Sequence, residues 1–306
     1  MKKIITVFSL LLAVTYTIHA QDTYKWAVTK QKDFNKTYPI GSAVINLKNQ
    51  FGKMEIRHWE KNEVKLEATI LVSTQEEAYA NILLDMIQIV EKADTDTISF
   101  RTQIGDENKG WSTNQSNKMS IDYIVYLPAS AKLKAHNSFG PMQIGNHNGE
   151  ADIQSSHGSL TAGHLSNIRS LKINFSKARI GKLGKTEADF RHSSIDIEEL
   201  TGDIKATVTF CNSLDIPVSS TVKNIDINTS HTSIYLLLPK SMGGEYDIAT
   251  THATASGKGS FELQEEKKSD NLRNRADFNH HYTGKLGNGG DAKINIKSNF
   301  GSVRLL

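Results

Sequence analysis

The sequence predicts an all-β protein, a single-stranded parallel β-solenoid with coils of about 17–21 residues and a small helix and hairpin insertion in its N-terminal half. Three observations indicate this fold class. A short frame recurs at that spacing through the second half of the chain. Apolar and polar residues alternate within each copy, as they do in half-buried strands. Glycines stand in the links between copies, where tight turns favour them. A period of this length with internal alternation is typical of stacked β-coils.

Each copy of the frame begins with an anchor residue, which is Phe, His or once Cys. The anchors of the second half are Phe139, His157, Phe175, His192, Cys211, His231, His252 and Phe300. Apolar residues three positions after the anchors are predicted to form one inward column, namely Met142, Leu160, Ala178, Ile195, Leu214 and Ile234. Ordering the backbone costs about 1–2 kcal/mol per residue, so a single coil with few apolar residues cannot be stable alone. Neighbouring coils must therefore share a core.

A β-sandwich is the alternative fold, because strands every 8 to 12 residues also fit that architecture. The anchored frame with its near-constant period favours the solenoid.

The first twenty residues predict a secretory signal peptide. Lys2 and Lys3 precede an apolar run over residues 4–14, and Ala20 offers a small residue for cleavage before Gln21. The apolar run is too short for a stable membrane anchor, and no later run reaches the length of a transmembrane span. We therefore expect residues 21–306 to form one exported domain, in the periplasm or on the cell surface or outside the cell.

The N-terminal half departs from the repeat. Residues 21–40 are expected to be a leading segment, and alternating strands follow over 41–72. A helix is predicted over about 75–84 with Thr74 as its N-cap. Residues 86–90 and 97–104 are predicted to form a hairpin, and 105–118 an exposed loop, so the insertion spans 75–118. A strand over 119–127 should end at Pro128.

From residue 131 the repeat continues, with inward positions four and two residues before each anchor, such as Leu171 and Ile173. Residues 262–290 are expected to be a mobile loop excursion before the final strands over 292–297 and 302–306. The N-terminal half and the segment 262–306 are the natural caps, because the ends of a coil stack are otherwise open sheet edges.

Three segments, residues 49–56, 137–144 and 299–305, carry a Phe-Gly anchor followed by an alternating strand. They resemble a large family of bacterial envelope proteins called putative adhesins, which are similar to adhesin head domains. The resemblance covers residues 40–306. It implies an exported, non-enzymatic β-helix of unknown function, and it brings no catalytic residues to carry over.

Charge and cysteine content exclude several classes of protein. Without Lys2 and Lys3 the chain has 36 − 2 = 34 basic residues against 33 acidic ones, which argues against nucleic acid as a partner. Cys211 is the single cysteine, so no internal disulfide can form. Its anchor position predicts a buried, inert thiol.

The histidines of the anchor column are the first candidates for a metal site. His157 and His192 are two coils apart, about 9.6 Å at β spacing, which is too far for one metal. His231 and His252 are expected to be adjacent, but two imidazoles alone make a weak site. A stacked ladder of these histidines with Phe139, Phe175 and Phe210 is the preferred interpretation, without metal or cofactor.

The outward column four residues after the anchors contains the candidate surface residues Arg179, Asp196, Asp215 and Tyr235. Two neighbouring carboxylates could hold Ca²⁺ or act as acid and base, which is what an alternative function as a β-helix polysaccharide lyase or hydrolase would need. The basic residue in the same column and the scarcity of outward aromatic residues favour a solvated ion-pair row. We therefore expect no catalytic residues and no enzyme, but a binding or structural protein whose partner is an envelope protein, a polymer or a surface.

Overall fold

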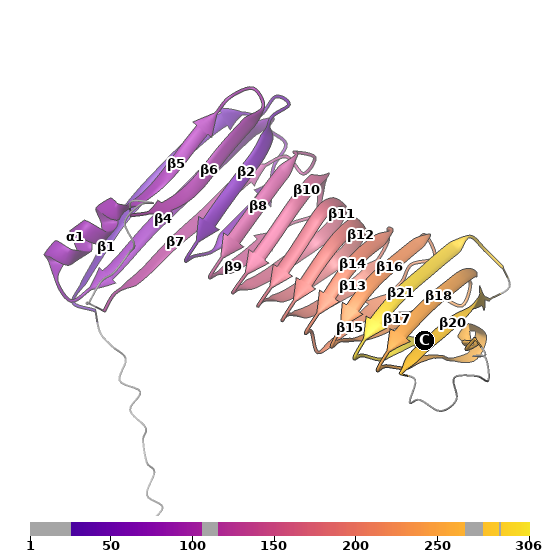
Figure 1. Cartoon of the computed structure of the whole chain (residues 1–306). Helices are drawn as coiled ribbons and strands as arrows, with labels where there is room; N and C mark the ends of the chain where they lie inside the picture. The colour runs from indigo at the N-terminus through magenta and orange to yellow at the C-terminus, as the bar shows by residue number, and fades with distance from the viewer. Residues whose placement is uncertain (1–25, 106–115, 267–277, 288) are drawn as a thin grey trace, which may run out of the picture.

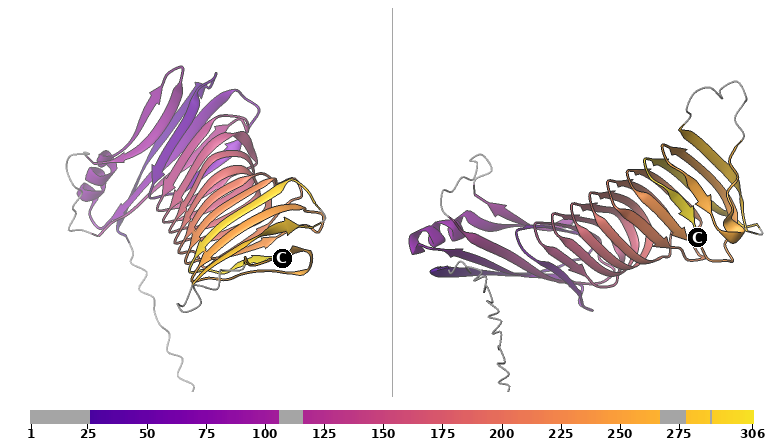
Figure 2. Two further views of the ribbon diagram at one scale, coloured as in Figure 1. Left: turned by 45° about the vertical axis from the view of Figure 1, so that its right-hand side comes forward. Right: turned by 90° about the horizontal axis from the view of Figure 1, so that it is seen from below.

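Two layers of mostly parallel strands face each other across one elongated apolar core (Figures 1 and 2).

The computed structural model describes residues 26–105, 116–266, 278–287 and 289–306. The predicted all-β class is confirmed. The predicted signal peptide lies outside the described residues. Among those residues, no helix has the length and apolar character needed to cross a membrane.

Layer A contains, in spatial order, β5 (Ile87–Ala93), β6 (Thr97–Ile104), β2 (Val44–Gln50), β8 (Leu133–Ser138), β10 (His147–Ser156), the second halves of β11 (Ser159–Asn174) and β12 (Lys177–Arg191), β14 (Ile204–Thr209), β16 (Asn224–Ser230), β21 (Ala292–Asn299), β18 (Gly244–Thr251) and β20 (Asn279–Leu286). The pairs at its two ends, β5–β6 and β18–β20, are antiparallel, and the others are parallel.

Layer B contains, in the same direction, β1 (Val28–Pro39), β4 (Glu63–Thr74), β7 (Lys118–Leu127), β3 (Met54–His58), β9 (Pro141–Ile144), the first halves of β11 and β12, β13 (Ser194–Leu200), β15 (Ser213–Pro217), β17 (Ser233–Leu237), β22 (Val303–Leu305) and β19 (Ala255–Gly257). From β8 to β17, each turn of chain thus places one strand in layer A and the next in layer B, with the anchor residue at the bend between them.

The predicted inward column is confirmed, since Met142, Leu160, Ala178, Ile195, Leu214 and Ile234 are all buried. Met54 and Val303 extend the column in register at its two ends. Apolar side chains from both layers fill the space between them. The core therefore runs the whole length of the stack, and its burial supplies the main driving force for folding.

The bend at each anchor has one recurring construction. The residue after the anchor is small, because the bend of the neighbouring coil lies close to it. A Cβ at Gly140 would be 2.0 Å from the carbonyl oxygen of Gly52 in that neighbouring bend. Where this residue carries a hydroxyl, the oxygen accepts a backbone N–H of the neighbouring bend, as Ser176 does from Gly158 at 3.1 Å. Inward hydroxyls also bind the bend, and Ser298 Oγ donates to the carbonyl oxygen of Gly301 at 2.7 Å.

The anchor of the sixth bend was assigned wrongly from the sequence. Phe210, not Cys211, has the positive φ angle of an anchor, and Cys211 occupies the small position after it. Its amide donates to Thr232 Oγ1 at 2.9 Å, and its thiol is buried as predicted. Burial raises the pKa of that thiol, so it is held in the neutral, unreactive form.

The spatial order of the last coils differs from the order in the sequence. The strands β21 and β22 lie between β16–β17 and β18–β19, although they follow both in the chain. Figure 1 shows β21 inserted between β16 and β18. The predicted excursion over 262–290 is also not only loop, because β20 pairs with β18 and closes layer A.

Two further expectations for the N-terminal half are corrected. The leading segment contains β1, which pairs antiparallel with β4 along its whole length. The helix α1 spans Glu77–Met86 and begins two residues later than predicted. Its N-cap is Glu76, without a side-chain cap, because Thr74 ends β4 and donates its hydroxyl to the carbonyl oxygen of Glu76. The hairpin β5–β6 is as predicted, and the Asp94 carboxylate accepts the amides of Asp96 and Thr97 in its turn.

Candidate functional site

Ten aromatic rings form one continuous stack along the edge where the two layers meet. Their spatial order is Phe51, Phe139, His157, Phe175, His192, Phe210, His231, Phe300, His252 and Phe278. Neighbouring ring centroids are 4.5–5.0 Å apart, and the planes are within 25° of parallel. The predicted stacked ladder is confirmed, and we call it the ring ladder.

The ring ladder is exposed to solvent. Its six Phe residues have exposed fractions between 36% and 55%, and its four His residues are exposed too. Each inner ring has a neighbour on both faces, so solvent meets mainly ring edges. A soluble domain normally scatters its exposed apolar side chains, and a contiguous apolar strip marks an interaction surface.

The backbone beneath the ring ladder is strained. Nine of its ten members have positive φ angles, between 48° and 61°, and among the described residues no other non-glycine residue does. Phe278 is the one ring without a positive φ. An L-residue in this left-handed region costs roughly 1–2 kcal/mol. Glycine or asparagine would suit such bends at lower cost. Stacking returns about 0.5–1.5 kcal/mol per pair, so the rings are compatible with the fold although they are not its simplest solution.

The predicted adjacency of His231 and His252 is wrong. Phe300 lies between them, at 4.8 Å from one ring and 4.7 Å from the other. The inserted β21–β22 unit brings this ring into the stack. Every His of the ring ladder therefore has Phe rings on both sides, which leaves no pair of imidazoles for one metal ion.

The predicted candidate surface residues do lie in one outward column of layer B, but they do not form an acid pair. Arg179 Nε lies 3.1 Å from Asp196 Oδ2, as an exposed ion pair. Asp215 pairs in register with Tyr235, whose ring lies 5.6 Å from the guanidinium of Arg304. The ion-pair interpretation is confirmed for Arg179 and Asp196.

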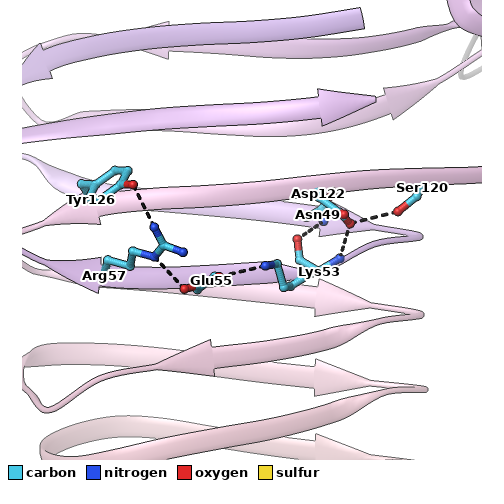
Figure 3. A network of polar contacts seen from close by, with 7 residues as sticks. All are labelled: Asn49, Lys53, Glu55, Arg57, Ser120, Asp122 and Tyr126. Atoms are coloured by element: carbon cyan, nitrogen blue, oxygen red, sulfur yellow. Dashed lines mark hydrogen bonds and ion pairs between the residues drawn. The ribbon is translucent and has the colours of Figure 1, made fainter. Parts of the chain in front are cut away.

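A second polar cluster lies on layer B near the N-terminal end (Figure 3). Glu55 accepts hydrogen bonds from Arg57 Nε at 2.6 Å and from Lys53 Nζ at 2.8 Å, which lower the pKa of its carboxyl to about 2. Arg57 also donates to the hydroxyl of Tyr126 at 3.0 Å, and the Lys53 amide donates to Asp122. The cluster ties β3 to β7 and keeps Glu55 ionised, so this carboxylate is not suited to general acid chemistry.

Histidines outside the ring ladder have structural contacts. His147 is fully buried, with its Nδ1 3.1 Å from His58 Nε2, and burial lowers the pKa of His147 to about 4. His281 lies between Asp247 and Glu266, at 2.9 and 2.8 Å, and these carboxylates raise its pKa. Sequence reasoning found neither arrangement, because each joins segments that are distant in the chain.

Comparison with known proteins adds little. Neither a protein-family model nor a curated protein matches the sequence. A solved structure from Clostridium sporogenes, named a putative cell adhesion protein, is 13% identical, and the match covers 90% of this chain and 99% of that chain at a TM-score of 0.27. A putative adhesin from Bacteroides fragilis matches with 13% identity, 90% and 97% coverage, and a TM-score of 0.27. Similarity at this level decides neither the fold nor the function of the chain.

Proposed function

We propose that this chain is an exported, non-enzymatic β-solenoid of the bacterial cell envelope, which binds an extended partner along its ring ladder. The solenoid description rests on the regular return of the chain. Successive coils pair in parallel and in register on both layers, as Met54, Met142 and Leu160 do in layer B. Repeated short coils of this kind build long, flat binding surfaces.

The observation that carries the binding role is the exposure of a strained, unbroken row of rings. Nine residues accept a left-handed backbone to present a ring at the surface, where glycine would be cheaper. Strain that persists at an exposed site points toward function, because folding alone does not require it.

A catalytic role has less support. The alternative of a polysaccharide lyase or hydrolase depends on Asp196 and Asp215 acting together. Asp196 is engaged with Arg179, and Tyr235, the aromatic residue of this column, is covered by the guanidinium of Arg304. The export part of the proposal is supported by the sequence of residues 1–20.

Binding is tested by co-sedimentation of the mature protein with isolated envelope fractions, such as sacculi and outer-membrane fragments. A variant with Phe139, Phe175, Phe210 and Phe300 replaced by Gly removes four rings and keeps the left-handed backbone. The matched control replaces four exposed outward residues, Lys134, Glu187, Asp196 and Lys205, by Ala. We expect retention of the wild type and the control and loss of the ring variant. Equal retention of all three proteins would contradict a binding role for the ring ladder.

Export is tested separately. N-terminal sequencing of protein recovered from the envelope fraction should start at Gln21. An intact Met1, or a cytoplasmic pool of the full-length chain, would contradict export.

A further inference from the structure

The C-terminal part of the ring ladder has uncharged neighbours on both sides. It comprises Phe210, His231, Phe300 and His252. The residues beside these rings are Thr209, Ser230, Asn299 and Thr251 on layer A, and Ser213, Ser233, Ser302 and Thr254 on layer B. Seven of these eight residues carry a hydroxyl group. In the five earlier coils, three of the ten equivalent positions hold charged residues, namely Lys53, Lys177 and Arg191.

Two shallow grooves adjoin the same part of the ring ladder. The groove on layer A has a volume of about 430 Å³, and its outward lining includes Thr207, Thr209, Asn228, Ser230, Thr251 and Asn299. Lys297 is the one charged residue in its lining. A second groove, of about 670 Å³, lies over the end of the ring ladder, where the rings of Phe300, His252 and Phe278 line it together with Thr254, His280 and Ser302. The rings therefore form a ridge with one groove beside it on layer A and one groove over its C-terminal end.

The chemistry of this ridge selects among partners. Hydroxyl and amide groups both donate and accept hydrogen bonds, so they suit a ligand with many hydroxyls. A polyanion would need several cations, and transfer of an unpaired charge onto this surface is unfavourable. The ring edges offer contact to aliphatic C–H groups. The same pattern repeats at the β spacing of about 4.8 Å, which suits an extended polymer of identical units.

We propose that the C-terminal part of the ring ladder binds a neutral polysaccharide, whose chain lies along the ridge with its hydroxyls in the two grooves. This proposal rests on the proposed function and specifies the class of its partner. The Ser230 hydroxyl lies 2.9 Å from His231 Nδ1 and the Thr251 hydroxyl donates to Asn279 at 2.8 Å, so the polar groups beside the rings are already oriented. Preorganised groups lose less conformational entropy on binding.

Phe175 and Phe300 provide a matched pair for the test. Each ring lies between two His rings, Phe175 between His157 and His192 and Phe300 between His231 and His252. Their φ angles are 50° and 56°, and their exposed fractions are 55% and 47%. They differ in their surroundings, because Lys177 lies beside Phe175 and Ser302 beside Phe300.

The experiment measures binding of the mature protein to dextran, mannan, laminarin and xyloglucan by affinity electrophoresis, with alginate and heparin as acidic polymers. We expect binding to at least one neutral glycan and weaker binding to the acidic ones. The Phe300→Gly variant should bind about tenfold more weakly, which corresponds to a loss of about 1.4 kcal/mol. Phe175→Gly lies outside the C-terminal part and should lose clearly less affinity than Phe300→Gly. Circular dichroism checks that both variants fold.

If Phe300→Gly does not fold, the double variant Thr251→Val and Ser302→Ala removes two hydroxyls from the grooves and should give the same loss of binding. The proposal is overturned if no neutral glycan binds, if alginate or heparin binds more tightly, or if both Gly variants lose affinity equally. Retention on envelope fractions that depends on the rings, without binding to any neutral glycan, would overturn this proposal alone and leave the proposed function intact.

Discussion

His231 and Phe300 stack with their ring centroids 4.8 Å apart, although β18, β19 and β20 lie between them in the sequence. The contact exists because β21 pairs with β16 on one side and with β18 on the other. The β21–β22 unit thus completes both the ring ladder and the core at this place. The stability of the C-terminal coils therefore depends on a segment that does not neighbour them in the chain.

The inward and outward positions of β13 should respond very differently to substitution. Ile195 is 8% exposed and contacts the core, whereas Asp196 faces solvent. Ile195→Asp buries a carboxylate without a partner and should destabilise the fold by several kcal/mol. Asp196→Ala should change the free energy of unfolding by well under about 1 kcal/mol, since an exposed ion pair contributes little. Urea unfolding measures both free energies. Similar effects of the two substitutions would show that the assignment of inward and outward positions in β13 is wrong.

The left-handed anchors should tolerate glycine better than alanine. At Phe175 both substitutions remove the ring, but Ala keeps a Cβ at φ 50°. We expect Phe175→Ala to be about 1 kcal/mol less stable than Phe175→Gly, the reverse of the usual order in regular structure. Denaturant unfolding of the two variants measures this difference. Greater stability of the Ala variant would contradict the strained backbone.

The small residue at each bend should be required for close stacking of the coils. Gly140→Ala would place a Cβ 2.0 Å from the Gly52 carbonyl oxygen, so the backbone must move, and we expect a loss of about 1–3 kcal/mol or more. Gly181→Ala is the control, because its nearest contact, to the Gly163 carbonyl oxygen, is 3.4 Å. Thermal unfolding should show a lower midpoint only for Gly140→Ala.

The contact between residues 265–266 and β20 should depend on pH through His281. Hydrogen bonds to Asp247, and to a smaller extent to Glu266, raise the pKa of His281 above 6.5. The stability that His281 contributes to this contact is therefore full below pH 6.5 and is lost as pH rises through the raised pKa. The bond from His281 is also the main cause that lowers the pKa of Glu266 below 4.5, so that contribution is lost as pH falls through the lowered value. Both contributions are full between about pH 4.5 and 6.5.

Hydrogen exchange provides the measurement for this pH dependence. The Glu266 amide donates to the His281 carbonyl oxygen at 2.9 Å, so its protection factor reports on the contact. Protection, corrected for the intrinsic exchange rate, should decline above pH 6.5 and should no longer do so in His281→Gln. A wild-type profile that does not change between pH 5 and 8 would exclude the ion-paired imidazole.

Catalysis on polysaccharides is not expected. The ion pair of Asp196 with Arg179 leaves no convergent acid pair with Asp215. Incubation with a panel of neutral and acidic glycans, followed by product analysis, should show no cleavage. If cleavage occurs and disappears in the double variant Asp196→Asn and Asp215→Asn, while that variant still folds, the protein is an enzyme and the proposal of a non-enzymatic function is wrong.

The sequence was sufficient for the frame, the inward column and the stacking of rings, because these depend on local alternation and on a constant period. The frame alone assigned one anchor wrongly to Cys211, because that coil has one additional residue, although Phe210 was expected as a ring of the ladder. The order of the last coils could not be predicted for a related reason. Both β18 and β21 present apolar side chains at the same positions, so either could pair with β16 by its own pattern.

The position of β21 has a consequence for biosynthesis. A ribosome produces β16 and β18 before β21, so the two strands that flank it are complete while their shared neighbour does not yet exist. During that interval each has an unpaired edge of the kind that recruits other chains. In folding from the first coil onward, native pairing therefore stops after β17, and the terminal coils reach their native order only when residues 292–305 are available.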